Sequence, residues 1–432
     1  MEQQSGRRDF LKTAAAAGLT TNIFTGNLRG ANDRISTAFI GIGRMGQGNM
    51  RAALLQENLV ISAVCDVYEP NLQKGVEESK GQARAVRDFR EILADKSIDV
   101  VCISTPDHWH AYMTVEACKA GKDVYVEKPI SVTIEEGQKM VQAARKYSRV
   151  VQAGTQQRSG IHFQKACELV KSGKLGKISF VRTWNVTLAD EAGIGNPPDG
   201  EPPSELNWDM WLGPAPRRTF NPNRFGVDPK AFSHFRWFWD YAGGMMSDWG
   251  VHLLDIVQMA FDEAQPVAAT ALGGKYHLKD NRETPDTLLV TYEYPGFVAV
   301  YENRNGSSVG APMNAGYGIL FQGSRGSLFV DRSRYVVIPE PKVKDLEPEE
   351  MKAQNNMNRD HWKNFIQCVQ TRQRPHSDIE ICHKSTTTCH LGNIALRARS
   401  RVDWDAQRET ILQNDARKLM YREYRKPWKL TV

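Results

Sequence analysis

The sequence lacks the features that mark several classes of protein. No uninterrupted apolar run reaches the roughly 18 residues that a membrane-spanning helix needs. The net charge is +6, yet no compact block of lysine and arginine indicates a nucleic-acid-binding surface. We therefore predict neither a membrane span nor a nucleic-acid partner.

Cysteine is too sparse for a disulfide scaffold, with seven residues in a chain of 432. The count is odd and the residues form no dense framework, which argues against a small disulfide-stapled fold. Cys65 and Cys102 end apolar runs, where a free cysteine behaves as a small hydrophobe. The pattern is typical of a protein that folds in a reducing compartment.

The first residues, "SGRRDFLKTAAAAGLTTNIF", are basic and then weakly apolar. Arg7 and Arg8 begin a pattern that resembles the twin-arginine export signal, which a receptor reads and which anchors nothing. We predict that residues 1–30 are such a signal and that the protein is exported already folded, to the periplasm or otherwise outside the cytoplasm. A basic amphipathic helix is the alternative.

A short apolar run over residues 35–40 leads into a glycine-rich turn and then a helical pattern. Gly41, Gly43 and Gly46 form the spacing that lets a backbone turn tightly and approach a pyrophosphate at a helix N-terminus. A second apolar run ends in Asp66, whose carboxylate would accept a ribose hydroxyl and repel a 2′-phosphate. This predicts NAD as the cofactor, with NADP less favoured. The alternative is a glycine turn with a helix-capping Asp.

Apolar strands and amphipathic helices continue to alternate up to about residue 153. Such alternation predicts an α/β fold with a doubly wound parallel sheet of the Rossmann type, covered by helices on both faces. Ligands of these sheets bind beyond the carboxyl ends of the strands. The polar and unusual residues fall at those ends, in "GIGRMG", "STPDHWH", "EKP" and "QAGTQQRS".

Two of these segments, Thr105–His110 and Glu127–Pro129, carry a family resemblance. The chain resembles the Gfo/Idh/MocA family, with Asp107 in place of the commoner Asn of the first motif. The resemblance covers essentially all of the chain after the signal. It implies a cofactor site built from Gly41, Gly43, Arg44, Met45, Gly46, Asp66, Ser104, Thr105, Pro106, His110, Glu127 and Lys128.

The second half contains short β-branched and aromatic runs separated by Gly, Pro and Asn, which predict strands. Together with the resemblance, they indicate an α+β domain with an open, mostly antiparallel sheet. We therefore predict three parts, residues 1–30, 31–155 and 156–432. The family also implies a homo-oligomer, a dimer or tetramer, formed through the open sheet face.

The segment "SDWGVHLLD" predicts a helix on which Asp248, His252 and Asp255 share a face. The resemblance implies that Asp248 and His252 line the substrate pocket with Lys128. We predict His252 as the base, Lys128 as the group that stabilises charge on the same oxygen, and Asp248 as the residue that orients one of them. A histidine packed in the core is the alternative.

Gln156 and Trp184 complete the predicted substrate contacts, together with Asp248 and His252. Tryptophan suits the apolar face of a sugar, but it is equally a large core residue. Two Cys-His pairs, at 382–383 and 389–390, suggest zinc, but adjacent residues point in different directions on a helix and no closing ligand pair is evident. We predict no metal.

These observations predict an NAD(P)-dependent oxidoreductase acting on a sugar or polyol hydroxyl by hydride transfer. Outside the cytoplasm free cofactor is scarce, so we expect NAD to be tightly bound and recycled internally. Two alternatives stay open. One is a glycoside hydrolase that uses NAD for transient oxidation and elimination, and the other is a non-catalytic sugar-binding protein on the same fold.

Overall fold

The computed structural model describes residues 34–226 and 233–432, which belong to one compact unit, Arg34–Val432. The predicted export signal, residues 1–30, lies outside the described residues. Among the described helices, none combines the length and the apolar character that crossing a membrane would require.

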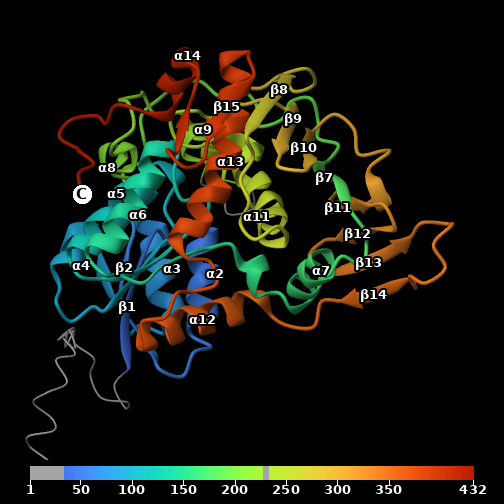
Figure 1. The fold of residues 1–432 in the computed structure, drawn as a ribbon. Coiled ribbons are helices and arrows are strands. Elements are labelled where there is room, and N and C mark those ends of the chain that lie inside the picture. The colour runs from blue at the N-terminus through green and yellow to red at the C-terminus, as the bar shows by residue number, and fades with distance from the viewer. Residues whose placement is uncertain (1–33, 227–232) are drawn as a thin grey trace, which may run out of the picture. The chain divides into compact units, whose positions relative to one another are not determined.

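The first sheet has six strands in the order β3-β2-β1-β4-β5-β6, and all of them are parallel, as the sequence pattern predicts (Figure 1). Its inner strands are buried along their whole length because helices cover both faces. The strands are β1 (Ile35–Ile40), β2 (Leu59–Cys65), β3 (Arg84–Val86), β4 (Val100–Ile103), β5 (Asp123–Val126) and β6 (Val151–Ala153). The helices between them are α2 (Arg44–Ala53), α3 (Glu69–Glu78), α4 (Phe89–Ala94), α5 (Asp107–Lys119) and α6 (Ile134–Lys146).

Local sequence explains where α6 begins. The Thr133 hydroxyl accepts the Glu136 N–H, and the Glu136 carboxylate accepts the Thr133 N–H, so the first turn is closed by a capping box. Glu136 also holds the C-terminal tail, because its Oε1 accepts from Arg422 Nε at 2.6 Å and from the Tyr424 hydroxyl at 2.6 Å.

The second sheet has ten strands in the order β14-β13-β12-β11-β7-β10-β9-β8-β15-β16. It is mostly antiparallel, as predicted, with β7 and β10 as the parallel pair. The strands are β7 (Ile178–Val186), β8 (Ala268–Gly274), β9 (Thr287–Tyr294), β10 (Phe297–Arg304), β11 (Tyr317–Gly323), β12 (Gly326–Val330), β13 (Arg334–Pro339), β14 (Glu349–Lys352), β15 (Val402–Asp405) and β16 (Thr410–Ile411).

Helices pack on one face of this sheet, so residues alternate between buried and accessible along β9 and β10. The longer helices near it are α7 (Ile161–Lys171), α11 (Gly250–Ala260) and α13 (Ile379–Ala398). Shorter ones are α8 (Trp208–Leu212), α9 (Pro222–Phe225), α10 (Gly244–Asp248) and α14 (Asn414–Arg417). Single 3-10 turns are η1 (Gln156–Ser159), η2 (His234–Trp237), η3 (Pro312–Asn314) and η4 (Lys418–Met420).

The last third of the chain returns to the first sheet. Helix α12 (Met357–Thr371) runs beside α2 (Figure 1). Its Trp362 stacks on Tyr125 of β5 with ring centroids 4.5 Å apart. Trp362 also stacks on Phe39 of β1, so it belongs to the core of the first sheet. The division at residues 155 and 156 stays a prediction, and packing crosses it.

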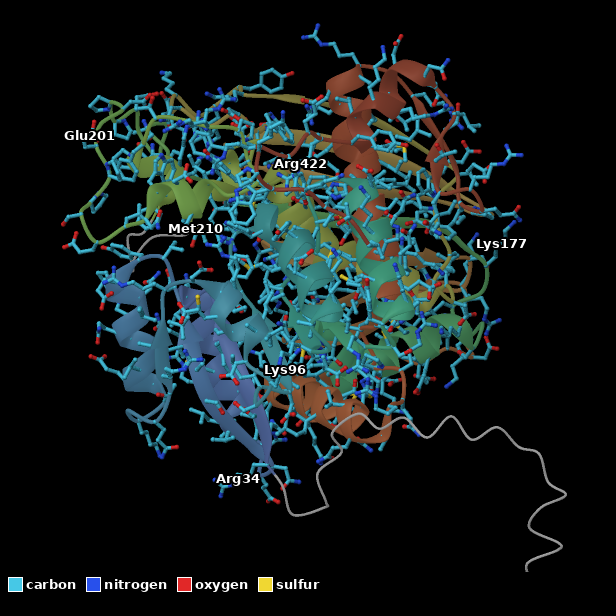
Figure 2. All side chains as sticks on the ribbon, turned by 90° about the vertical axis from the view of Figure 1, so that its left-hand side faces the viewer. Arg34, Lys96, Lys177, Glu201, Met210 and Arg422 are labelled. Carbon is cyan, nitrogen blue, oxygen red and sulfur yellow. The ribbon has the colours of Figure 1, made fainter. Side chains whose placement is uncertain are left out.

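A segment between β7 and α10 also reaches the first sheet, and we name its residues 187–226 the cover segment. Asn207 N–H donates to Val67 O at 3.0 Å, and Glu69 N–H donates to Glu205 O at 3.1 Å. Figure 2 shows Met210 where this segment meets the helices of the first sheet, and Glu201 at its outer edge. These two backbone hydrogen bonds attach the cover segment to the residues that follow β2 in the chain.

Candidate active site

A cavity of about 720 Å³ lies at the carboxyl ends of the first sheet's strands, against α10, α11 and the cover segment. This is the place where parallel α/β sheets bind ligands, and the volume suits a cofactor with a small substrate. Fourteen of the sixteen predicted site residues line it: Gly41, Gly43, Arg44, Met45, Asp66, Ser104, Thr105, Pro106, His110, Glu127, Lys128, Gln156, Asp248 and His252.

The glycine turn has the geometry that its sequence predicts. Gly41 has a φ of +87°, and a Cβ there would lie 2.7 Å from the Ser104 backbone. A Cβ on Gly46 would lie 2.0 Å from Gly41 O, so the turn requires glycine at this position. Gly46 itself does not line the cavity. Gly43 faces open space, and α2 begins after it without a side-chain cap. The N–H groups in the first turn of α2 are therefore free to donate hydrogen bonds to a phosphate.

Asp66 stands beside this turn. Its Oδ2 accepts the Ile42 N–H at 2.7 Å and its Oδ1 accepts the Tyr68 N–H at 2.9 Å. Burial raises the pKa of Asp66 to about 6, against these hydrogen bonds, which lower it. An acceptor fixed at the end of β2, next to bare helix N–H groups, fits the ribose and the pyrophosphate of NAD.

Lys128 and Asp248 form the centre of the opposite wall. Lys128 Nζ donates to Asp248 Oδ1 at 2.7 Å and to Asp248 O at 3.0 Å, and Arg236 Nε donates to the same Oδ1 at 2.9 Å. Burial would raise the pKa of Asp248, but Arg236 and Lys128 together hold it well below its ordinary value. Asp248 therefore stays ionised and orients Lys128.

His252 lies on α11, one turn after Asp248, with its side chain 6% exposed. Burial, and then the positive charges of Lys128 and Arg332, hold the pKa of His252 well below its ordinary value. Its Nδ1 is buried without a hydrogen-bond partner among the described residues. The imidazole is thus neutral at neutral pH, as a proton acceptor must be.

Asp107, which stands where the family pattern has Asn, lines the same wall. Burial raises its pKa to about 7, and Asp248 adds to this while Arg236 and Lys128 oppose it. Near neutral pH a large share of Asp107 is therefore a neutral carboxylic acid. A neutral carboxylic acid donates a hydrogen bond, as an Asn amide does.

We expect Asp107→Asn to keep turnover within about twofold at neutral pH and to remove an alkaline decline in rate. As pH rises through about 7, Asp107 ionises, loses its donor and places a second negative charge beside Asp248. Asn stays neutral throughout. The measurement is kcat/KM against pH for both proteins, and an alkaline limb unchanged in the variant would contradict the assignment.

Backbone contacts tie the strand ends of this wall together. The two ring nitrogens of His110 lie 2.8 Å from Thr105 O and 2.7 Å from Pro129 O, so His110 joins the ends of β4 and β5. Glu127 accepts from the Asn49 amide at 3.0 Å and from the Gln156 amide at 3.2 Å. These residues position the wall rather than offer a reactive group.

Trp184, predicted to contact substrate, lies away from the lining of the cavity. It is fully buried on β7, stacks on Phe329 at 5.9 Å and donates its indole N–H to Ala315 O at 2.7 Å. This is the core position that was the alternative for it. The side chain faces the side of β7 opposite to Val181, which packs against the helices, and it lies in a small cluster with Val186, Ala311 and Phe329.

Asp255 does not line the cavity with Asp248 and His252. A break at Trp249, where the His252 N–H donates to Trp249 O, three residues back, at 3.1 Å, leaves Asp248 on α10 and both His252 and Asp255 on α11. Asp255 pairs instead with Arg158, whose Nε lies 2.8 Å from Asp255 Oδ2. Burying an acid is costly, and this partner removes the cost without any role in the cavity.

Arg236 and Arg332 line the cavity but are absent from the sequence prediction, and Trp249 also lines it. Arg236 precedes the helical motif in "HFRWFW", and Arg332 lies in a hairpin turn, "DRS". No sequence pattern around either residue distinguishes it from an ordinary arginine on the protein surface. Trp249 is inside the motif, and its position between Asp248 and His252 was the available signal.

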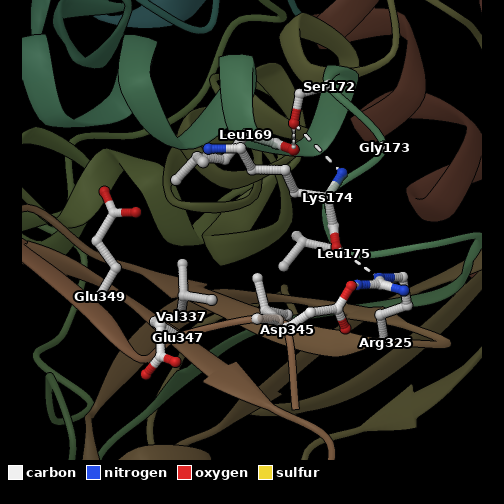
Figure 3. Close-up of a pocket in the computed structure, with 11 residues that line it drawn as sticks. Leu169, Ser172, Gly173, Lys174, Leu175, Arg325, Val337, Asp345, Glu347 and Glu349 are labelled. Atoms are coloured by element: carbon white, nitrogen blue, oxygen red, sulfur yellow. Dashed lines mark hydrogen bonds and ion pairs between the residues drawn. The ribbon is translucent and has the colours of Figure 1, made fainter. Parts of the chain in front are cut away.

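A second hollow, of about 550 Å³, lies between the end of α7 and strands β12 to β14. Figure 3 shows Arg325 of its wall paired with Asp345, with Nη2 and Oδ2 2.6 Å apart. None of the predicted site residues lines it. The Arg325–Asp345 ion pair is exposed to solvent, so it does not hold a reactive group in a fixed position.

The described part of the chain contains no group of three or more His, Cys, Asp or Glu residues suited to a metal ion. The Cys-His pairs lie on α13, which packs against α6 and α11. His390 Nε2 lies 3.4 Å from the Ser131 hydroxyl, and His383 Nε2 lies 3.4 Å from Glu409.

Two sequence profiles of Gfo/Idh/MocA oxidoreductases match the chain. The NAD-binding Rossmann-fold profile matches residues 35–155, and the C-terminal alpha/beta-domain profile matches residues 184–430. Together they cover the first sheet, the second sheet except for most of β7, and every predicted catalytic residue. The first of them assigns NAD binding to the domain that holds the glycine turn and Asp66.

Curated relatives match over a shorter stretch. Myo-inositol 2-dehydrogenase of Thermotoga maritima is 28% identical over 153 residues, which is 35% of this chain and 45% of the relative. A glycosyl hydrolase family 109 protein of Shewanella baltica is 31% identical over 169 residues, 32% of this chain and 37% of the relative. The alignments thus span less than half of either relative.

Solved structures match over most of the chain. The aldose-aldose oxidoreductase of Caulobacter crescentus superposes with a TM-score of 0.65, covering 86% of this chain and 99% of that chain. Its sequence identity to this chain is 18%, so the likeness is one of fold.

Proposed function

Because the chain belongs to the Gfo/Idh/MocA oxidoreductase family, we propose that it transfers hydride between NAD and a hydroxyl-bearing carbon of a sugar or polyol. The observation that carries this proposal is the convergence of Lys128, Asp248 and a neutral His252 opposite the glycine turn, in one cavity. The similarity to an inositol dehydrogenase supports the substrate class.

Each side chain has a distinct part in the proposed reaction. Bound NAD supplies the hydride acceptor. His252 takes the hydroxyl proton, because its imidazole is neutral and lies in the same wall as Lys128. Lys128 Nζ, held by Asp248, donates to the oxygen as its negative charge grows. Arg236 keeps Asp248 ionised, so Lys128 stays in place.

We propose export by the twin-arginine route, and with it a cofactor that stays bound and is recycled. The Arg7-Arg8 pattern supports export, and all seven cysteines are free and buried, as in a protein folded before export. A dehydrogenase that released its cofactor outside the cytoplasm would stop after one turnover. The fold likeness to an aldose-aldose oxidoreductase is consistent with a second substrate that returns the hydride.

The cover segment supports retention of NAD. Its Phe225 meets the Tyr68 ring edge-on at 5.2 Å, two residues after Asp66, and its Trp211 lines the same cavity. These rings cover the cavity next to the residue proposed to hold the ribose. Release of NAD would then require the cover segment to move.

We expect Phe225→Ala to raise the dissociation rate of NAD about tenfold, the effect of losing one edge-to-face aromatic contact. The measurement is the loss of bound nucleotide from the purified protein during dilution, followed by mass spectrometry. Phe220→Ala is the matched control, because Phe220 is equally buried and touches Phe225 but does not line the cavity. Rapid dilution of NAD from the unaltered protein would contradict retention.

We also propose a homo-oligomer, a dimer or tetramer, formed through the second sheet. Leu272 and Leu289 are paired across β8 and β9 and are 81% and 48% exposed. Apolar side chains side by side on an open sheet face favour a partner surface. Light scattering of the purified protein tests this.

A glycoside hydrolase that oxidises and re-reduces its substrate is the second candidate, and the similarity to a glycosyl hydrolase family 109 protein favours keeping it. The two reactions differ in what is released. Reduction of bound NAD by a free sugar supports the oxidoreductase, while release of nitrophenol from a nitrophenyl glycoside without net cofactor change supports the hydrolase. Purified protein without any nucleotide would contradict both.

A further inference from the structure

Arg332 lies in the turn between β12 and β13 and lines the cavity on the substrate side. Its guanidinium carbon lies 4.8 Å from the centre of the Trp249 ring. Its charge also lowers the pKa of His252, which places it near the proposed base. The turn itself is fixed, because the Asp331 N–H donates to Arg334 O at 2.9 Å and Asp331 O lies 2.9 Å from His162 Nε2.

The adjacent acid does not neutralise Arg332. Asp331 Oδ1 accepts the Ser333 N–H at 2.7 Å and the Arg334 N–H at 2.9 Å, so that oxygen closes the turn. Among residues 34–226 and 233–432, no carboxylate lies within ion-pair distance of the Arg332 guanidinium. By contrast, the two other cations of this wall, Lys128 and Arg236, both contact Asp248.

Among the described residues, Arg332 is therefore the cation of this wall that no carboxylate contacts. Of the acids that line the wall, Asp248 is held by Lys128 and Arg236, Glu127 accepts from the Asn49 and Gln156 amides, and burial keeps a large share of Asp107 in its neutral form. Burial also lowers the pKa of Arg332, against the influence of Tyr317 and Asp248, which raise it. A half-buried guanidinium without an acid favours an anionic ligand, and its planar fork matches an oxyanion.

We propose that Arg332 binds an oxyanion substituent of the substrate, so that the natural substrate is an acidic sugar or polyol, with a carboxylate as the group. This inference rests on the proposed function for the identity of the site. A carboxylate beside Trp249 would leave the sugar's carbinol within the wall formed by His252 and Lys128. A sugar phosphate presents the same chemistry to Arg332, and the experiment separates the two.

The test compares matched sugars on the holoenzyme by isothermal titration calorimetry and by absorbance of the reduced nicotinamide. The probes are glucuronate and galacturonate, their neutral counterparts glucose and galactose, and glucose 6-phosphate. We expect at least one acidic sugar to bind about tenfold or more tighter than its neutral counterpart, as for a charge-assisted pair. Arg332→Met should abolish this preference, and Arg332→Lys should restore part of it.

Arg334→Met is the matched control, because Arg334 lies in the same turn but its Nη1 faces Glu350 at 3.2 Å. It should leave the preference unchanged. If Arg332→Met weakens the binding of glucose 6-phosphate but not of the two uronates, the oxyanion is a phosphate instead of a carboxylate. Equal affinity for acidic and neutral sugars, or an equal loss of both in Arg332→Met, would overturn the inference. So would loss of bound NAD in that variant, since Arg332 would then hold the cofactor.

The outcomes also separate this inference from the proposed function. Arg332-dependent binding of an acidic sugar without any reduction of bound NAD would remove the oxidoreductase assignment and leave the anion site. Reduction of bound NAD by acidic and neutral sugars alike, at rates that Arg332→Met leaves unchanged for both, would keep the oxidoreductase and remove the anion site.

Discussion

Lys128→Met is expected to lower the rate of hydride transfer by about 10²–10³-fold, with NAD still bound. The ammonium is the donor that we propose for the reacting oxygen, and it is held in place because Asp248 Oδ1 and Asp248 O both accept from Nζ. Methionine keeps the length of the side chain but donates nothing. It also leaves Asp248 with Arg236 as its remaining cation.

Single-turnover reduction of bound nicotinamide measures this effect without product release. Lys119→Met is the control, because Lys119 is also paired with an acid, Glu116 at 2.8 Å, but does not line the cavity. A variant that reduces NAD at the original rate would show that another group stabilises the oxygen. Mass spectrometry confirms that the cofactor is retained.

His252→Asn is expected to lower turnover by about 10²–10⁴-fold, the usual share of a general base. Burial and the neighbouring cations hold the pKa of His252 well below its ordinary value. Protonation of His252 removes the proton acceptor, so the rate should fall as pH falls. Because the pKa of His252 is lowered, this acidic limb should lie below about 6.5, the pKa of a free histidine. The variant should lose this limb.

The measurement is the pH dependence of kcat/KM, in which Asp107 contributes the alkaline limb. His277→Asn is the control, because His277 contacts Ala189 O of the cover segment and is absent from the cavity lining. An acidic limb that persists in His252→Asn would assign the proton to a different group.

The first sheet was predictable because its signals are local. Glycine spacing, a strand ending in Asp66 and buried apolar runs each specify the chain over a few residues, and the parallel order follows from them. Lys128, Asp248 and His252 were found through motifs that resemble a family. Their convergence in one cavity depends on packing between distant segments, which no local pattern encodes.

The misplaced and missing residues share one physical reason. Trp184 is the residue type that stacks on sugars, but its ring is buried with Val186, Ala311 and Phe329 on the side of β7 opposite to the main core. Asp255 has helical spacing from Asp248, but a break at Trp249 and the buried Arg158 decide where it points. No local pattern marks Arg332, because its proposed role depends on the neighbouring Asp331, whose carboxylate closes the turn instead of pairing with the guanidinium.

The position of Trp362 has a consequence for synthesis of the chain. Its ring lies between Phe39 and Tyr125 in the middle of the first sheet, although more than two hundred residues separate it from the end of that sheet. A nascent chain that stops before α12 would leave both of these aromatic residues uncovered. The cofactor-binding half is thus completed only near the end of translation, and proteins truncated before residue 357 should accumulate as chaperone-bound or degraded species.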